Sequence, residues 1–382
     1  MIVRKEQPVF GERIKEAREI RGFSQTTLSE LVKVKRQAIS AYEKDKINPS
    51  PETLFAIATS TEFPVRFFLN ERPRGDSLRT SPISFRKKSI ASKTAKLQAT
   101  QYENLLADIF FYVNHYLDFH PAKIPFYENI DYLSLSESSI EKIASGVRRT
   151  WGLGDGPISD MMRLLENNGI IIAEIKLPYT LDAVSTWRHN RPFILLSDSS
   201  TSCARRRFNL AHELGHLVLH QMVSEKDFEN KELLNRLENQ AHRFAGAFLF
   251  PAASVRSEYF SNSMIALKNL KGRWKISIAA ISKRLLDLGL INKHQRQYIM
   301  INLKNRKNEI LDDTIPTENP ALLERAFEML LENHILSIRN AIDDLMISDE
   351  IFSMLTGIEI KKQNNADEKI IPFGLHQINR NL

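Results

Sequence analysis

Residues 211–220, which read AHELGHLVLH, constrain this chain more than any other part of its sequence. The apolar residues around the motif predict a buried helix. On a helix, residues i and i+4 lie on one face, about 6 Å apart along the axis, so His212 and His216 can hold one metal ion. Glu213 is close enough to act on a water molecule without being a ligand. The pattern indicates a zinc-dependent hydrolase; the alternative interpretation is a helix with two surface histidines.

A zinc hydrolase needs a third protein ligand and an open fourth position. His220 lies about 12 Å along the same helix from His212, too far to share its ion. A third histidine six residues after the second is excluded, because position 222 is Met222. A second helix before Pro251 is indicated by the apolar residues Leu234, Leu237, Ala241, Phe244 and Phe248.

Two polar residues lie one turn apart on a flank of that second helix. We predict that Glu238 is the third zinc ligand and that His242 orients a ligand. The alternative is that Glu238 is solvated. Upstream, residues 169–175, 182–187 and 192–197 are apolar and β-branched, which predicts three strands of a small sheet. Its edge beside the metal offers backbone hydrogen bonds to an extended peptide.

The N-terminal quarter of the chain carries the positive charge. Residues 1–100 hold 20 Lys and Arg and 11 Asp and Glu, a net charge of +9. Residues 101–382 hold 33 basic and 35 acidic residues, a net charge of −2. A basic module on a nearly neutral body suggests a polyanionic partner for that module, although a solvated basic surface has the same composition.

Residues 11–69 predict four or five short helices, two of them joined by a tight turn. Ser24 is a favourable N-cap for the first of this pair. The second displays Gln37, Ser40 and Ala41 on its outward face while Ile39 points inward. Two short helices of this kind, the second with small polar residues exposed, form a helix-turn-helix.

The segment FSQTTLSELVKVKRQAISAYEKDKINPSPETLFAIA, residues 23–58, resembles the phage-repressor-like (XRE) helix-turn-helix family. The resemblance implies that Gln25 holds a phosphate of double-stranded DNA and that Arg36, Gln37 and Ala41 face base edges. Arg and Gln suit this role because each can make two hydrogen bonds to one base. Two positions where the family has glycine are Lys33 and Asp45 here. A module that only dimerises the chain or binds a protein is the alternative.

The body of the chain resembles the ImmA/IrrE family of zinc metallopeptidases. The resemblance lies in the segments RRTWGLGDGPISDMMRLLENNGIII, DAVSTWRHNRPFILLS, RRRFNLAHELGHLVLH and LENQAHRFAGAFLFP. It implies Zn²⁺ as the cofactor and Glu238 as the third ligand, whereas His242 stands where the family commonly has asparagine. Members of the family cleave DNA-binding repressors, so the implied substrate is a repressor-like regulatory protein.

Together these features predict a mainly α protein with a small β-sheet. We expect a five-helix XRE-type DNA-binding domain at 1–70, a basic linker at 71–99, a zincin-like peptidase core at 100–255 and a C-terminal helical region at 256–382. No apolar run approaches the roughly 20 residues of a membrane helix. A single cysteine and no signal-like N-terminus predict a cytoplasmic protein.

We therefore expect a DNA-binding regulator with a zinc-dependent endopeptidase domain, acting as a homodimer on an operator and on a protein substrate. Two other functions fit the same sequence. One is a non-proteolytic transcription factor whose zincin-fold domain senses a small ligand. The other is a component of a toxin–antitoxin or phage-defence system.

Overall fold

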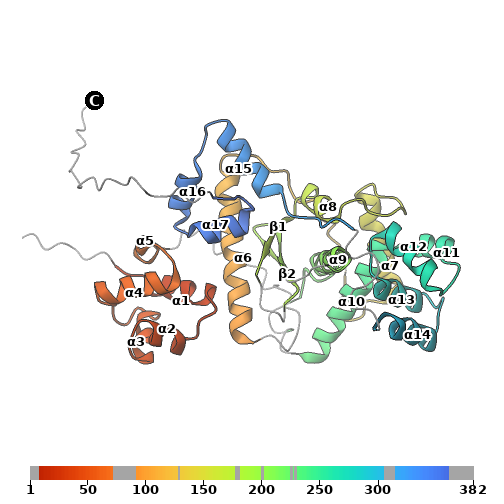
Figure 1. Ribbon diagram of the computed structural model, residues 1–382, viewed down its shortest axis with the longest axis horizontal. Helices are drawn as coiled ribbons and strands as arrows, with labels where there is room; N and C mark the ends of the chain where they lie inside the picture. The colour runs from red at the N-terminus through yellow and green to blue at the C-terminus, as the bar shows by residue number, and fades with distance from the viewer. Residues whose placement is uncertain are drawn as a thin grey trace, which may run out of the picture.

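The computed structural model of the chain is mainly helical and holds one three-stranded sheet (Figure 1). It describes residues 8–71, 92–127, 130–176, 181–198, 202–223, 227, 230–304 and 315–360. Most of the predicted linker, residues 72–91, lies outside this described part. The predicted fold class is confirmed. None of the helices in the described ranges is both long and apolar enough to cross a bilayer.

The first five helices form the N-terminal module. They are α1 (Gly11–Ile20), α2 (Gln25–Leu31), α3 (Arg36–Tyr42), α4 (Pro51–Thr61) and α5 (Val65–Leu69). Ser24 caps α2, because its hydroxyl accepts a hydrogen bond from the Thr27 N–H at 3.0 Å. The turns after α2 and α3 place Lys33 and Asp45 at φ 56° and 54°. These are the two positions where the resemblance leads us to expect glycine, and a non-glycine residue costs about 1 kcal/mol in this left-handed conformation.

Helix α6 (Lys93–Asn114) lies between the N-terminal module and the sheet (Figure 1). Ser92 caps it by accepting a hydrogen bond from the Ala95 N–H at 3.1 Å. The predicted linker therefore ends too late, since its last seven residues, 93–99, are helical. The reason is tertiary: Ala95 and Ala99 are buried in the core that α6 shares with the module.

The predicted C-terminal region, 256–382, is not one unit. Its first part packs in a core on the side of the sheet that faces away from α6. Its last described part packs with α6 and the N-terminal module instead. The first part contains α12 (Met264–Trp274), α13 (Ile278–Asp287) and α14 (Lys293–Lys304), and it follows the short helix α11 (Ala252–Glu258). The last part contains α15 (Leu322–Glu332), α16 (Ile338–Leu345) and α17 (Asp349–Thr356).

Polar contacts fix the N-terminal module against its neighbours. The Gln98 side chain on α6 donates to the Ile20 carbonyl at 2.8 Å. Arg66 on α5 forms an ion pair with Asp343 on α16. Residues more than 270 positions apart in sequence are thus in contact. The module is held directly against the body of the protein as well as being joined to it by the chain.

The sheet has the order β1-β3-β2, with β1 (Ile171–Ile175) parallel and β2 (Ala183–Arg188) antiparallel to β3 (Arg191–Ser197). His189 and Asn190 join β2 to β3, and their φ values of 46° and 61° suit a tight hairpin of right-handed twist. Alternate strand residues enter two separate cores. One core contains α6. The other contains α11–α14 and four further helices, α7 (Glu137–Thr150), α8 (Met161–Asn167), α9 (Cys203–Leu219) and α10 (Lys231–Leu249).

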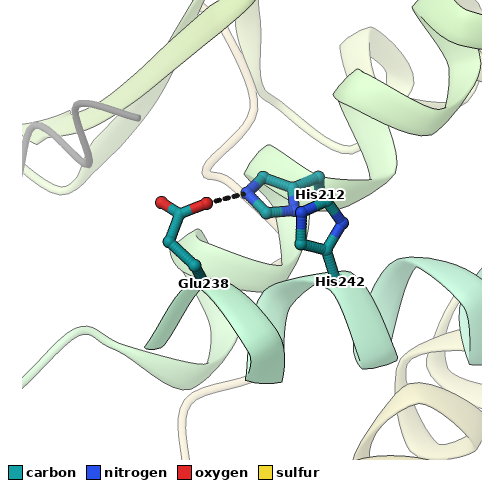
Figure 2. A group of neighbouring side chains, drawn as sticks. All are labelled: His212, Glu238 and His242. Carbon is teal, nitrogen blue, oxygen red and sulfur yellow. Dashed lines mark ion pairs between the residues drawn. The ribbon is translucent and has the colours of Figure 1, made fainter. Parts of the chain in front are cut away.

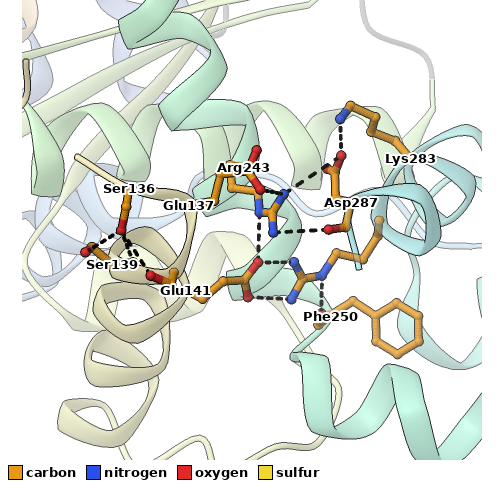
Figure 3. A network of polar contacts seen from close by, with 10 residues as sticks. Ser136, Glu137, Ser139, Glu141, Arg243, Phe250, Lys283 and Asp287 are labelled. Carbon is orange, nitrogen blue, oxygen red and sulfur yellow. Dashed lines mark hydrogen bonds and ion pairs between the residues drawn. The ribbon is translucent and has the colours of Figure 1, made fainter. Parts of the chain in front are cut away.

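A partly buried ionic cluster holds α7, α10 and α13 together (Figure 3). The Arg284 guanidinium makes two hydrogen bonds to the Glu141 carboxylate and donates to the Phe250 carbonyl at 2.9 Å. Arg243 donates to the same carboxylate at 2.9 Å. Burial alone would raise the pKa of Glu141, but the hydrogen bonds from both arginines lower it. One carboxylate therefore bridges two arginines at this junction, and Glu137 and Asp287 supply further negative charge beside Arg243.

Glu141→Ala is expected to lower the free energy of unfolding by about 3 kcal/mol, because it leaves the buried Arg284 without its anion. The measurement is chemical denaturation followed by circular dichroism. Glu137 is the matched control, since it lies on the same helix and pairs with Arg243 at 2.9 Å but has a side chain that is 77% exposed. Glu137→Ala should cost less than about 1 kcal/mol. Equal losses in the two variants would contradict the assignment.

Candidate metal centre

Helix α9 brings the two histidines of the HELGH motif together in the interior. His212, Glu213 and His216 are all at most 1% exposed. The Nε2 atoms of His212 and His216 are 3.0 Å apart, so both ring nitrogens face one point. The alternative of two surface histidines is excluded by their burial.

A glycine within the motif lets the second helix come close. A side-chain carbon at Gly215 would lie 3.2 Å from both the Cα and the carbonyl oxygen of Ala241 on α10. That spacing is tighter than ordinary packing, so glycine at position 215 suits the observed approach of α9 and α10. This approach brings side chains of α10 up to the histidine pair.

Glu238 is the α10 residue that reaches both histidines. Figure 2 shows its contact with His212. Its two carboxylate oxygens lie 3.4 Å from His212 Nε2 and 3.6 Å from His216 Nε2. Burial alone would raise the pKa of Glu238, but the adjacent imidazoles of His212 and His216 outweigh burial and hold that pKa far below the usual range. The carboxylate is therefore ionised. It is also not fully solvated, since the side chain is 27% exposed.

The spacing of these donor atoms fits zinc. Ligands about 2.0–2.2 Å from a tetrahedral zinc ion lie about 3.3–3.6 Å from one another. Glu238 lies 3.4 Å from His212 and 3.6 Å from His216, within this range, and the separation between the two histidines, 3.0 Å, is slightly shorter. Two imidazoles and one carboxylate are also ligand types that zinc uses in hydrolases.

His242 lies one turn after Glu238, beside the same site (Figure 2). Its ring centroid is 4.4 Å from that of His212, and it stacks on Phe208 at 5.7 Å. Ligand-capable atoms of His212, Glu238 and His242 all lie within 4.8 Å of one another. The sequence predicts that His242 orients a ligand, and its position also allows it to supply a ligand atom itself.

Glu213 is held by a residue that the sequence analysis missed. Ser185 on β2 donates from its hydroxyl to Glu213 Oε2 at 2.7 Å, and both side chains are buried. The available signal was a hydroxyl residue at the centre of a short, buried strand. Which carboxylate it would meet is not encoded locally.

A second missed contact lies behind His216. The Nδ1 atoms of His216 and His220 are 2.9 Å apart, and His220 Nε2 lies 2.8 Å from Gln240 Oε1. Burial lowers the pKa of His220 to about 3, so the ring is neutral at neutral pH. His220 thus contacts the Nδ1 edge of His216, whereas His212 lies at its Nε2 edge.

The helix-turn-helix residues lie on the outer side of the N-terminal module. Arg36 and Gln37 on α3 are exposed, and Ser40 and Ala41 are half-buried on the same helix. Gln25, at the start of α2, donates to Glu43 Oε2 at 2.7 Å, which fixes the start of α2 against the end of α3.

Family comparisons agree with both resemblances. Residues 166–286 match the model of a peptidase family described as an IrrE N-terminal-like domain. Residues 14–68 match a helix-turn-helix family model. No curated protein matches the chain. The chain therefore joins a helix-turn-helix domain to a domain of the IrrE-like peptidase family, and the predicted fusion is confirmed.

Proposed function

We propose that this chain is a transcriptional regulator that hydrolyses a peptide bond in a repressor-like protein at a zinc centre. The observation that carries the proposal is the convergence of His212, His216 and Glu238, with donor atoms 3.0–3.6 Å apart, beside the buried carboxylate of Glu213. His212, His216 and Glu238 would hold the ion. A zinc ion in this position lowers the pKa of a water molecule toward neutrality and polarises a peptide carbonyl.

Glu213 is the proposed proton carrier. The Ser185 hydroxyl donates to Glu213 Oε2 at 2.7 Å and orients the carboxylate, an oxygen of which would accept the proton of the attacking water. As the C–N bond breaks, the same oxygen delivers that proton to the leaving amine. Ser185 orients the carboxylate throughout and takes no proton itself.

Strand β2 is the proposed platform for the substrate backbone. Within the described residues it pairs with β3 along one edge and with no strand along the other. Ser185 lies in this strand, so a peptide added to its free edge would run close to Glu213. Such pairing reads the backbone, and side-chain contacts would then select the cleavage site.

The direct test of peptidase activity is incubation of the zinc-loaded chain with repressor-like proteins from its own gene neighbourhood. We expect one cut in one substrate, located by mass spectrometry and lost on chelation. The proximity of His242 favours a second candidate function, a ligand-sensing regulator without turnover, because four protein ligands would close the site. Zinc uptake without cleavage of any candidate would favour that function.

We further propose that the N-terminal module binds double-stranded operator DNA in the cytoplasm and that the chain acts as a homodimer. The exposed side chains of Arg36 and Gln37 on α3 support base contacts in the major groove. Ser40 and Ala41 would lie against the same base edges, and Gln25 would hold a phosphate. A dimer matches the paired half-sites that helix-turn-helix proteins usually bind.

Gln37→Ala is expected to reduce discrimination between operator and unrelated duplex by about 1–3 kcal/mol, because it removes contacts to a base edge. Binding of the full chain to both duplexes is measured at several salt concentrations. Gln25→Ala is the matched control, since loss of a phosphate contact should weaken binding to all sequences alike. Uniform weakening by Gln37→Ala would show that Gln37 only positions the module.

A further inference from the structure

We propose that His220 and Gln240 are positioning residues that fix the tautomer and ring orientation of His216. The inference rests on the zinc site proposed above and is independent of turnover. It concerns residues outside the three proposed ligands. His220 follows the end of α9, and Gln240 lies on α10 two residues after Glu238.

The contacts form one continuous series of hydrogen bonds through the interior. His216 Nδ1 lies 2.9 Å from His220 Nδ1, and His220 Nε2 lies 2.8 Å from Gln240 Oε1. Gln240 Nε2 then donates to the backbone carbonyl of Tyr132 at 2.8 Å. His216, His220 and Gln240 are at most 5% exposed, so water does not compete for these bonds.

The carbonyl of Tyr132 determines which atom donates and which accepts in each of these three hydrogen bonds. A carbonyl only accepts, so the Gln240 amide must turn its NH₂ group toward it and its oxygen toward His220. His220 must then donate from Nε2, which leaves a lone pair on its Nδ1. His216 must donate from Nδ1 to that lone pair, and its Nε2 lone pair is left facing His212 and Glu238. This is the tautomer that a metal ligand bonding through Nε2 requires.

Tyr132, the last residue of this series of hydrogen bonds, is held in place by its own side chain. The Tyr132 ring packs with Val223, Leu233 and Leu237, and its hydroxyl donates to Asp227 at 2.9 Å. Because Gln240 lies on α10 and His216 on α9, the bonds also tie the two helices that carry the proposed ligands. His216 and Glu238 are thereby held at a fixed separation.

His220→Leu is the decisive variant, because leucine keeps much of the volume and removes the acceptor at Nδ1. We expect zinc to bind about 10–100-fold more weakly, as is typical when a partner of a ligating histidine is lost. His220→Asn should recover most of the affinity, since its side-chain oxygen can take the place of Nδ1. Affinity is measured by competition with a chelating indicator, and the absorption spectrum of the cobalt-loaded chain reports ligand geometry.

Ser254→Ala on α11 is the control, because it removes a partly buried hydrogen bond, from the Ser254 hydroxyl to the Asp155 carbonyl, that involves neither α9 nor α10. It should leave zinc affinity unchanged. Gln240→Met breaks the link to Tyr132 without touching His220 and should weaken zinc at least about threefold; it carries the test if His220→Leu does not fold.

Wild-type zinc affinity in His220→Leu or in Gln240→Met would overturn this inference and leave the proposed function standing. So would a His220→Asn chain that binds zinc as weakly as His220→Leu. A wild-type chain that takes up no zinc would overturn the proposed function together with the inference.

Discussion

The Glu213→Gln chain is expected to keep its zinc and to lose cleavage by about 100–10,000-fold, the usual contribution of a general base. The amide has nearly the shape of the carboxylate but cannot accept the proton of the attacking water. Zinc content is measured by metal analysis, and cleavage is measured with the substrate identified for the wild-type chain. The variant also keeps an acceptor for the Ser185 hydroxyl, so the local packing is preserved.

Ser185→Ala is the matched variant, because it removes only the group that orients Glu213. Its expected loss of cleavage is about tenfold, well below that of Glu213→Gln. Cleavage by Glu213→Gln at the wild-type rate would place the base elsewhere. Loss of zinc from Glu213→Gln would mean that Glu213 is a ligand.

Glu238→Ala is expected to weaken zinc binding by more than about 100-fold, beyond the range seen when a partner of a ligand is lost. The variant leaves two donors, His212 and His216, where a hydrolytic zinc site has three. It also removes the carboxylate oxygens that lie 3.4 and 3.6 Å from the two histidines. Zinc is measured by metal analysis and by competition with a chelating indicator.

Glu232→Ala on the same helix serves as the control, since Glu232 is exposed in the first turn of α10. It should bind zinc as tightly as the wild type. Full zinc occupancy in Glu238→Ala would contradict Glu238 as the third ligand. Loss of zinc from His242→Ala would then make His242 the third ligand, since a ligand-capable atom of His242 lies within 4.8 Å of such atoms in His212 and Glu238.

The packing partners of the C-terminal helices could not be predicted from their position in the sequence. Helix α17 has a clear apolar stripe, and Ile351, Phe352 and Leu355 are buried. The pattern predicts that this face is covered. It does not say that the cover is the core shared by α6, β1 and the N-terminal module.

The sequence by itself determined what depends on local spacing. His212 and His216 share a face because they are one helical turn apart. The short helices of the N-terminal module follow from caps such as Ser24 and from apolar periodicity, and the strands follow from short apolar runs. Glu238 was reached in the same way, as a polar residue on the flank of a helix whose apolar face had to be buried.

Only the tertiary structure decided which distant groups meet. The hydroxyl of Ser185 reaches Glu213 across 28 positions, and Gln240 reaches both His220 and the Tyr132 carbonyl, 108 positions away. Helix α6 begins before residue 100 because its alanines find a partner surface in the N-terminal module. Hydrophobic burial is not directional, so an apolar stripe fixes that a face is covered and leaves its partner to the packing of the whole chain.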